Sequence, residues 1–237
     1  MTLLFPKLEI YQDGADEADV RTGADNELIA GFTTNPTLMA KAGITDYKTA
    51  AFNLIKVSKG KPISLEVFAD DFDQMEYQAR LIASYGENIF VKIPAQNTKG
   101  LSTTPLVKKL SLDGIKLNVT AVFTDDQFDD IVSASSGGNK CIISVFAGRI
   151  ADTGIDPVPV MSSYAKRISD IDNLSLLWAS PREVLNVYQA HETGCDIITA
   201  TPDLIAKLSL YKKDLKEYSR ETVQMFYDDA QKQQFML

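Results

Sequence analysis

The chain has 237 residues, of which 45% are hydrophobic and 24% charged, a composition that is typical of a globular protein and excludes a disordered or fibrous chain. Its net charge of −8 argues against nucleic acid as a partner, because binding to a phosphate backbone depends on positive charge. The sequence indicates neither a secretory signal nor a membrane span, so we expect a soluble cytoplasmic protein.

Eight short apolar, β-branched runs recur along the chain and are typical of buried strands. They are Leu8–Asp13, Leu28–Thr34, Ile63–Phe68, Ile89–Pro94, Ile115–Phe123, Lys140–Phe146, Leu174–Ala179 and Cys195–Ala200. Segments with helical spacing lie between them, including Tyr47–Ser58, Phe72–Tyr85, Pro105–Leu110 and Pro181–Thr193. This alternation predicts a parallel sheet with crossover helices. Eight such units in a chain of this length favour a single α/β domain, a closed (β/α)8 TIM barrel, over an open doubly wound sheet.

One more amphipathic segment, Lys212–Gln234, follows the eighth unit. Its apolar stripe consists of Leu215, Tyr218, Val223, Phe226, Tyr227 and Ala230. A helix beyond a closed barrel needs a surface against which to bury such residues, and the periodicity leaves two surfaces open: a neighbouring subunit and the bottom of the same barrel. We expect one domain over residues 1–237, with residues 212–234 forming an additional C-terminal helix.

Few side chains are available for histidine or metal chemistry. The single histidine, His191, falls in a helical segment and is expected to be structural. Cys141 and Cys195 lie in apolar runs, where a thiol usually packs as a small hydrophobe. The acidic pairs are expected to cap helices or face solvent rather than bind metal. They are Asp70–Asp71, Asp125–Asp126 and Asp129–Asp130.

Polar residues end most of the eight runs. Catalytic residues of a TIM barrel lie at the carboxyl ends of the strands, which meet at one face, so these residues are candidates for a site. In chain order they are Asp13, Thr33, Thr34, Asn35, Glu66, Lys92, Asn118, Thr120, Ser144, Arg149, Ser180, Arg182, Thr199 and Thr201. The apolar Phe146, at the end of the sixth run, is a further candidate.

Lys92 is the most informative of these residues. It lies between apolar neighbours in the middle of a run, and strand alternation places it on the same face as Phe90. Desolvation disfavours an ammonium, and a neutral amine can attack a ketone to form a Schiff base. The alternative is a structural lysine that snorkels or pairs with Asp13 or Glu66. A Schiff-base enzyme that cleaves a carbon–carbon bond also needs a general base and a group that manages water, and these two carboxylates are available for those tasks.

A second group of candidates follows the sixth and seventh runs. Arg149, Ser180 and Arg182 lie near the place where many TIM barrels bind phosphate. Arginine matches phosphate in a bidentate geometry, and a serine at the start of a helix adds a donor. We therefore expect a phosphorylated substrate.

Six motifs together resemble those of the transaldolase family, in order and at similar spacing. They are GFTTNPTL (Gly31–Leu38), FVKIP (Phe90–Pro94), LNVTAVF (Leu117–Phe123), SVFAGRI (Ser144–Ile150), ASPR (Ala179–Arg182) and GCDIITATP (Gly194–Pro202). The resemblance extends from Asp13 to the C-terminus, and the length is similar to that of the small bacterial branch, which includes the fructose-6-phosphate aldolases. The chain departs from the family at Gly14, where a threonine is usual, and at Ala95–Gln96.

The resemblance implies a cofactor-free enzyme that moves a dihydroxyacetone unit between sugar phosphates. It implies that Lys92 forms the Schiff base, that Asp13 takes and returns a proton, and that Glu66 and Thr120 hold the water of imine formation. It assigns no metal site. Small members of the family form pentamers and decamers in which the C-terminal helix packs on a neighbour, so a homo-pentamer or homo-decamer is expected.

The same resemblance implies how substrate is bound. Asn35 and Asn118 would bind sugar hydroxyls, and Thr33 and Ser144 would line the pocket. The phosphate would be held by Arg149, Ser180 and Arg182.

Two positions distinguish the activities within this family. Transaldolases carry Glu and Phe where fructose-6-phosphate aldolases carry Gln and Tyr, and this chain has Glu66 and Phe146. A tyrosine hydroxyl can help to protonate the enamine and release dihydroxyacetone, whereas a phenyl ring donates no proton. The resemblance therefore implies exchange of fructose 6-phosphate and erythrose 4-phosphate for sedoheptulose 7-phosphate and glyceraldehyde 3-phosphate, in the pentose phosphate pathway. Two alternatives stay open: an aldolase that releases dihydroxyacetone, and a non-catalytic barrel that binds sugar phosphates.

Overall fold

The computed structural model describes residues 5–233, which fall into two compact units. The first extends to Ile205 and contains all eight named strands. The second begins at Ala206 and contains a short 3₁₀ helix, η1 (Lys207–Leu210), and one long helix, α11 (Leu215–Gln233).

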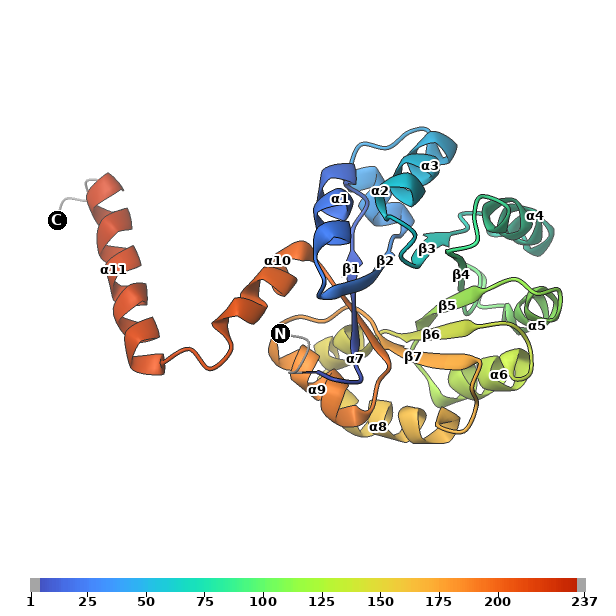
Figure 1. Ribbon diagram of the computed structural model, residues 1–237. Helices are drawn as coiled ribbons and strands as arrows, with labels where there is room; N and C mark the ends of the chain where they lie inside the picture. The colour runs from blue at the N-terminus through green and yellow to red at the C-terminus, as the bar shows by residue number, and fades with distance from the viewer. Residues whose placement is uncertain (1–4, 234–237) are drawn as a thin grey trace. The chain divides into compact units, whose positions relative to one another are not determined.

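The strands of the first unit form a closed parallel barrel in chain order (Figure 1). They are β1 (Glu9–Asp13), β2 (Ile29–Thr33), β3 (Ile63–Glu66), β4 (Ile89–Pro94), β5 (Leu117–Val122), β6 (Cys141–Val145), β7 (Leu174–Trp178) and β8 (Ile197–Ala200). Each strand pairs with the next, and β8 pairs with β1. Every expected apolar run contains one strand, so the prediction of a TIM barrel is confirmed.

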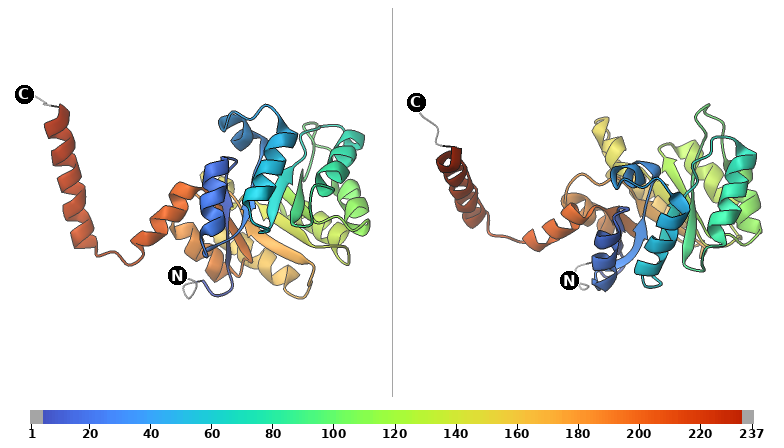
Figure 2. Two further views of the ribbon diagram at one scale, coloured as in Figure 1. Left: turned by 45° about the horizontal axis from the view of Figure 1, so that its top comes forward. Right: turned by 90° about the horizontal axis from the view of Figure 1, so that it is seen from above.

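Helices connect the strands and lie around the outside of the barrel (Figures 1 and 2). They are α1 (Glu17–Asp25), α2 (Pro36–Lys41), α3 (Tyr47–Val57), α4 (Phe72–Ala83), α5 (Thr104–Leu112), α6 (Asp125–Ser135), α7 (Ala147–Asp152), α8 (Pro157–Ile168) and α9 (Leu185–Thr193). A further short helix, α10 (Pro202–Ala206), follows β8. Parallel strands require such crossovers, because each chain segment must return to the same end of the sheet.

Local capping explains where several helices begin. The Asp71 carboxylate accepts hydrogen bonds from the first backbone N–H groups of α4, and Thr124 forms a capping box with Gln127 at the start of α6. Asp125 and Asp126 then occupy the first turn of α6, where negative charge favours the helix dipole. Of the acidic pairs, Asp70–Asp71 thus supplies a cap, whereas Asp125–Asp126 acts through the dipole of α6.

The helix expected over Pro181–Thr193 begins later than predicted, at Leu185. Asn186 accepts hydrogen bonds through its side-chain oxygen from the backbone N–H groups of Arg182, at 2.7 Å, and Glu183, at 3.2 Å. These bonds hold residues 181–184 in a non-helical turn, because an asparagine side chain satisfies the donors that a preceding helical turn would otherwise use.

The interior of the barrel is filled in layers, as strand alternation requires. Tyr11 and Phe90 pack with Ile142 and Ile197 in a cluster of buried side chains. Lys92, two residues beyond Phe90 on β4, faces the same interior but lies nearer the carboxyl ends of the strands. The apolar layer therefore closes the barrel beneath the lysine.

The two cysteines and the histidine occupy packing positions. Cys141 and Cys195 are buried, and burial raises the pKa of the Cys141 thiol to about 11. Such a thiol stays protonated and packs as a small apolar group. His191 lies in α9 with its ring edge-on to Phe5, at 5.7 Å between ring centroids. Residues 5–233 contain no cluster of His, Cys, Asp and Glu side chains that is suited to hold a metal ion.

The second unit contains the C-terminal helix that the sequence predicts. The helix α11 begins at Leu215, three residues after the expected start at Lys212, and the expected last residue, Gln234, lies outside the described residues. None of its residues is buried, and the side chains of Leu215, Val223 and Phe226 are 80%, 63% and 62% exposed. Within the part of the chain that the structure describes, no helix has the length and apolarity needed to cross a bilayer.

Candidate active site

A cavity of about 130 Å³ lies at the carboxyl ends of the strands. It is lined by Asp13, Thr33, Asn35, Lys92, Thr120, Ser144, Phe146, Arg149, Ala179, Ser180 and Thr199. Most of the predicted site residues are therefore brought together around one space. Among the residues to which the family resemblance gives a role, Glu66, Asn118 and Arg182 do not line it, and the further candidates Thr34 and Thr201 do not line it either.

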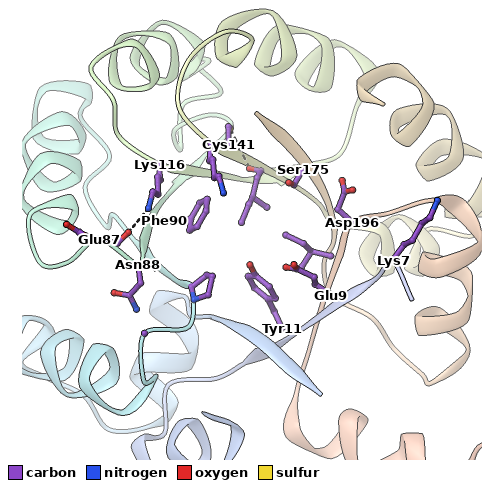
Figure 3. A pocket seen from close by; sticks show the side chains of 15 residues that line it. Lys7, Glu9, Tyr11, Glu87, Asn88, Phe90, Lys116, Cys141, Ser175 and Asp196 are labelled. Carbon is purple, nitrogen blue, oxygen red and sulfur yellow. Dashed lines mark hydrogen bonds between the residues drawn. The ribbon is translucent and has the colours of Figure 1, made fainter. Parts of the chain in front are cut away.

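A larger cavity, of about 770 Å³, lies at the opposite end of the barrel (Figure 3). Its lining includes Tyr11 and Phe90 from the apolar layer, together with Lys7, Glu9 and Lys116 near the amino ends of the strands. None of the predicted site residues contributes to it. The amino end of a TIM barrel is ordinarily the stabilising face, so chemistry rather than volume identifies the smaller cavity as the candidate active site.

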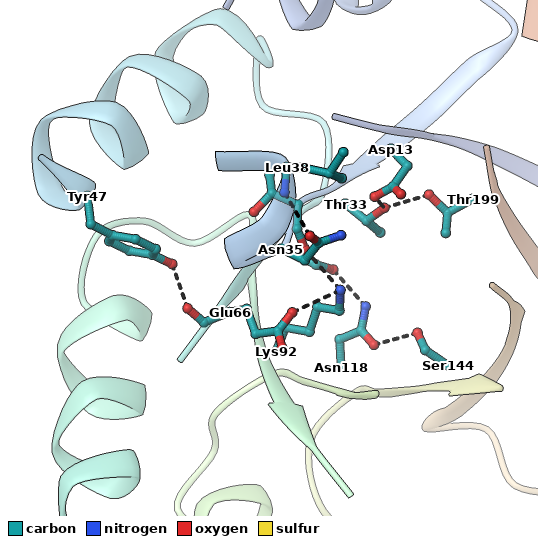
Figure 4. A network of polar contacts seen from close by, with 12 residues as sticks. Asp13, Thr33, Asn35, Leu38, Tyr47, Glu66, Lys92, Asn118, Ser144 and Thr199 are labelled. Atoms are coloured by element: carbon teal, nitrogen blue, oxygen red, sulfur yellow. Dashed lines mark hydrogen bonds and ion pairs between the residues drawn. The ribbon is translucent and has the colours of Figure 1, made fainter. Parts of the chain in front are cut away.

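The amine of Lys92 lies at the centre of a polar network (Figure 4). Its Nζ atom is 3.1 Å from Oε2 of Glu66 and donates a hydrogen bond to the backbone oxygen of Thr34, at 3.0 Å. Glu66 and Lys92 are direct partners in the register of β3 and β4. Only 6% of Lys92 is exposed, so the amine is desolvated, paired with a carboxylate and open to the cavity at once. A carboxylate at this distance can exchange a proton with the amine.

The Tyr47 side chain supports Glu66 from outside the barrel. Its hydroxyl donates a hydrogen bond to the backbone oxygen of Glu66, at 2.8 Å, from the first residue of α3. This contact fixes the end of β3 at the position from which the Glu66 carboxylate reaches Lys92.

The carboxylate of Asp13 lies across the cavity, at the end of β1. The hydroxyl of Thr33 donates to its Oδ1 atom at 2.7 Å, and the two residues are partners in the register of β1 and β2. Burial raises the pKa of Asp13 above its ordinary value, while the positive charge of Lys92 and the hydrogen bond from Thr33 act in the opposite direction. A general base is most effective when its pKa is moved toward the working pH, so this environment suits proton transfer.

The side chain of Asn118 on β5 links β3 and β6 beside the lysine. Its amide nitrogen donates to Oγ of Ser64 at 2.9 Å, and its amide oxygen accepts from Oγ of Ser144 at 2.6 Å. Asn118 is the register partner of Lys92 on β5. It therefore positions Ser144 at the cavity wall, although the residue itself is fully buried.

Thr120 and Asn35 offer polar groups to a ligand. The hydroxyl of Thr120 is buried and has no hydrogen-bond partner among residues 5–233, so it is available to a water molecule or a substrate hydroxyl. The side-chain oxygen of Asn35 accepts from the backbone N–H of Leu38, at 2.9 Å, and caps α2. This cap leaves the amide NH₂ group of Asn35 as its free donor.

The cationic residues are only partly assembled. Arg149 lines the cavity with Ser180, and its guanidinium lies 5.2 Å from the centroid of the Phe146 ring. Arg182 instead pairs with Asp152 at the end of α7, and both side chains are about half exposed. The structure thus brings two of the three predicted phosphate ligands to the cavity and holds the third beside it.

Two of the four non-glycine residues with positive φ among residues 5–233 lie at the same end of the barrel. Ser180 and Ala121 have φ angles of +61° and +58°, values that non-glycine residues rarely adopt. They follow β7 and lie within the bulged end of β5, next to Ala179 and Thr120 of the cavity wall. Strained residues persist where the surrounding structure determines the backbone, and they are frequent at functional sites.

Three contributors to the site were not assigned a role from the sequence. Thr199 lines the cavity, and its Oγ1 atom is 2.5 Å from Oγ1 of Thr33. Its position at the end of a strand made it a candidate site residue, but a threonine hydroxyl by itself does not indicate which function it has. The carbonyl of Thr34 and the hydroxyl of Tyr47 contact Lys92 and Glu66, respectively, and no spacing in the sequence predicts either contact.

A desolvated lysine and two carboxylates at the carboxyl face of a closed parallel barrel define this protein as a (β/α)8 barrel with a candidate catalytic centre. The chain belongs to the transaldolase/fructose-6-phosphate aldolase family, whose model matches residues 10–237. This confirms the resemblance stated from its motifs.

Curated relatives agree with this family. A protein of Dehalococcoides mccartyi named probable transaldolase is 33% identical over 193 residues, which is 81% of this chain and 86% of the relative. A protein of Brucella anthropi with the same name is 33% identical over 216 residues, 91% of this chain and 94% of the relative.

Solved structures support the fold alone. The crystal structure of 2,3-dimethylmalate lyase, a member of the PEP mutase/isocitrate lyase superfamily, has a TM-score of 0.58 at 13% identity and covers 97% of this chain and 86% of that chain. The crystal structure of KGPDC from Streptococcus mutans has a TM-score of 0.55 at 13% identity, and the match covers 83% of this chain and 88% of that chain. At such identities the similarity extends to the barrel and not to its chemistry.

Proposed function

We propose that this protein is a transaldolase, which transfers a dihydroxyacetone unit from a ketose phosphate to an aldose phosphate through a Schiff base on Lys92. The observation that carries the proposal is the position of the Lys92 amine, which is buried, open to the cavity and 3.1 Å from Glu66. Membership of the family and the names of relatives at about 33% identity support it.

The first half of the reaction uses Lys92 and Glu66. The neutral amine attacks the C2 carbonyl of fructose 6-phosphate, and loss of water from the carbinolamine forms the iminium ion. Before the attack, Glu66 accepts a proton from the Lys92 ammonium and so leaves the amine neutral. After the attack, a proton moves from the nitrogen to the alkoxide to give the carbinolamine, and Glu66 then gives its proton to the hydroxyl that leaves as water. The unpartnered hydroxyl of Thr120 holds the water that leaves and later returns.

The bond cleavage uses Asp13. Its carboxylate takes the proton of the C4 hydroxyl, and the C3–C4 bond breaks. The electron pair of that bond moves into the iminium and gives a neutral enamine. Glyceraldehyde 3-phosphate leaves. When erythrose 4-phosphate binds, the enamine carbon attacks its aldehyde and Asp13 returns the proton to the new alkoxide. Addition of water to the iminium then releases sedoheptulose 7-phosphate and restores the free amine of Lys92.

The remaining cavity residues bind the sugar phosphate. The side chains of Asn35 and Ser144 reach the hydroxyls of the chain, with Asn118 holding Ser144 in place. Arg149 and Ser180 contact the phosphate, and Arg182 joins them when it separates from Asp152.

Transfer is favoured over release because Phe146 lies in the cavity wall. Its ring packs against Phe123, at 5.5 Å between centroids, and beneath Arg149. A phenyl ring supplies no proton to the enamine, so the intermediate persists until an acceptor aldehyde arrives. We place this exchange in the pentose phosphate pathway of the cytoplasm.

Trapping of the imine tests the proposal. Borohydride reduction in the presence of fructose 6-phosphate is expected to add a covalent mass to the peptide that contains Lys92. The variant Lys92→Ala should gain no mass. Lys116→Ala, which removes a lysine from the cavity at the other end of the barrel, is the matched control and should be modified like the parent chain. Equal trapping by Lys92→Ala contradicts the assignment.

A coupled assay separates the alternatives. Glyceraldehyde 3-phosphate should form from fructose 6-phosphate only when erythrose 4-phosphate is present. Equal formation without the acceptor indicates an aldolase that releases dihydroxyacetone. Binding of fructose 6-phosphate by calorimetry with no trapped imine indicates a non-catalytic barrel.

A further inference from the structure

We infer that Thr199 is a positioning residue for Asp13, and that it acts through the hydroxyl of Thr33. The inference rests on the proposed role of Asp13 as the group that takes the proton from substrate. It assigns a function to the end of β8, a strand that gives no residue, either within it or directly after it, to the proposed mechanism.

The three side chains form a short chain of contacts across adjacent strands. Thr33 on β2 donates to Oδ1 of Asp13 on β1 at 2.7 Å, and its oxygen lies 2.5 Å from that of Thr199 on β8 (Figure 4). Since β1 pairs with both β2 and β8, the two threonines flank the strand that carries the carboxylate. Thr33 and Thr199 are only 2% and 6% exposed.

Counting protons fixes the direction of these hydrogen bonds. A threonine hydroxyl has one proton to donate, and an ionised carboxylate can only accept. While Asp13 is ionised, the proton of Thr33 is committed to Asp13. In the contact between the two hydroxyls, Thr33 is therefore the acceptor and Thr199 the donor.

This arrangement strengthens the bond that Asp13 receives. A hydroxyl that accepts a hydrogen bond becomes a better donor, and bonds to an ionised acceptor are the strongest of their kind. The Thr199 hydroxyl thereby favours the ionised carboxylate and opposes the effect of burial, which raises the pKa of Asp13. It also restrains the rotation of Thr33, and so the carboxylate, relative to the substrate.

The other charged groups that face Asp13 come from different elements. Lys92 of β4 and Arg149 of α7 line the same cavity, and Glu66 of β3 lies behind the lysine as its ion-pair partner. A substitution at Thr199 leaves all three in place. A change in the titration of Asp13 can then be assigned to the lost hydroxyl.

The variant Thr199→Val removes the hydroxyl and keeps the shape, while Thr199→Ser keeps the hydroxyl and is the matched control. For Thr199→Val we expect the acid limb of the pH profile of kcat/KM to move upward by about half a pH unit, with a loss in kcat of about threefold. KM for the donor should change little, and the serine variant should restore both values. Unchanged profiles in Thr199→Val overturn the inference, as does an equal loss in the valine and serine variants.

A second measurement needs no substrate. The difference in melting temperature between chains with and without Asp13→Asn, followed against pH, reports the pKa of Asp13 in the folded state. We expect this transition at higher pH in the Thr199→Val background than in the parent, and the same transition in both overturns the inference. Where the valine variant fails to fold, Thr199→Ala replaces it in the same comparison. The melting-temperature comparison does not depend on turnover. Absence of a trapped imine in the parent chain therefore counts against the proposed function and leaves the inference about Thr199 to be decided by the melting temperatures.

Discussion

The backbone of Gly148 lies against the carbonyl group of Ser180, so closely that a Cβ atom on residue 148 would be 1.5 Å from that oxygen. The amide of Gly148 also donates to the backbone oxygen of Ala179, at 3.2 Å. These contacts join the start of α7 to the end of β7. They bring Arg149 and Ser180 to the same cavity wall, and only glycine fits at the point of contact.

Replacing Gly148 with alanine should therefore damage both stability and phosphate binding. We expect a lower melting temperature and a KM for fructose 6-phosphate that rises about tenfold, because a misplacement near 1 Å is enough to weaken a charged contact strongly. Gly14→Ala is the control for stability, since a Cβ there meets open space. A Gly148→Ala chain with the parent melting temperature and KM would show that the two segments separate without cost.

The two arginines should contribute unequally to phosphate binding. Arg149 lines the cavity, whereas Arg182 must first separate from Asp152. We expect Arg149→Gln to raise KM for the phosphorylated donor about tenfold or more and Arg182→Gln to raise it less. Unphosphorylated fructose is the control substrate, for which KM should be similar in all three chains. Equal effects on both donors would mean that these arginines do not bind the phosphate.

The carboxylate of Asp13 should reduce stability while it serves catalysis. Because its pKa is raised in the folded state, the folded chain binds more protons than the unfolded chain between the ordinary value of 3.8 and the raised value. Stability conferred by this group therefore falls as pH rises through that window, and it stays lower above it. We expect Asp13→Asn to have a higher melting temperature than the parent at neutral pH, a difference that shrinks as pH falls through that window toward 3.8, together with a loss of activity of about a hundredfold or more. A lower melting temperature at neutral pH would contradict this account.

Substitution of Phe146 tests the choice between transfer and release. A tyrosine at this position adds a hydroxyl to the cavity wall, from which the enamine can be protonated. Phe146→Tyr should produce glyceraldehyde 3-phosphate without an acceptor, at a rate about tenfold or more above the parent. Phe146→Leu removes the ring and adds no donor, so it should not gain this activity. Release by the leucine variant as well would assign the effect to lost packing.

Much of the site was predictable from the sequence because strand register determines it. Lys92 stands between apolar neighbours, which places it in the barrel interior, and Glu66 ends the preceding strand. Neighbouring parallel strands bring such residues side by side, as the 3.1 Å contact shows. The same rule accounts for Asp13 and Thr33, which are partners on β1 and β2.

Other features could not be predicted because they depend on side-chain choices between distant loops. The pairing of Arg182 with Asp152 joins the turn after β7 to the end of α7, and no periodicity relates the two positions. The late start of α9 depends on one side-chain oxygen of Asn186. The acceptor for Lys92 is a backbone carbonyl, that of Thr34, which every residue possesses and no sequence pattern marks.

The apolar stripe of α11 should bury itself in a neighbouring subunit. We propose a homo-pentamer or homo-decamer, as expected from the family resemblance. None of the residues of this helix is buried, and the large apolar side chains of Leu215, Val223 and Phe226 are more than half exposed. Native mass spectrometry and light scattering should show an assembly larger than a dimer. Phe226→Glu, which places a charge on the stripe, should shift the population toward smaller species. Gln224→Glu adds the same charge to the opposite side of the helix and should leave the assembly intact.

Two outcomes decide between the surfaces that the sequence leaves open. A monomer at micromolar concentration would exclude the neighbouring subunit and assign the stripe to the bottom of the same barrel. An assembly that is insensitive to Phe226→Glu would show that another surface of the chain holds the subunits together. Circular dichroism of both variants distinguishes these outcomes from unfolding of the helix, because a charge exposed on one face leaves its backbone hydrogen bonds unchanged.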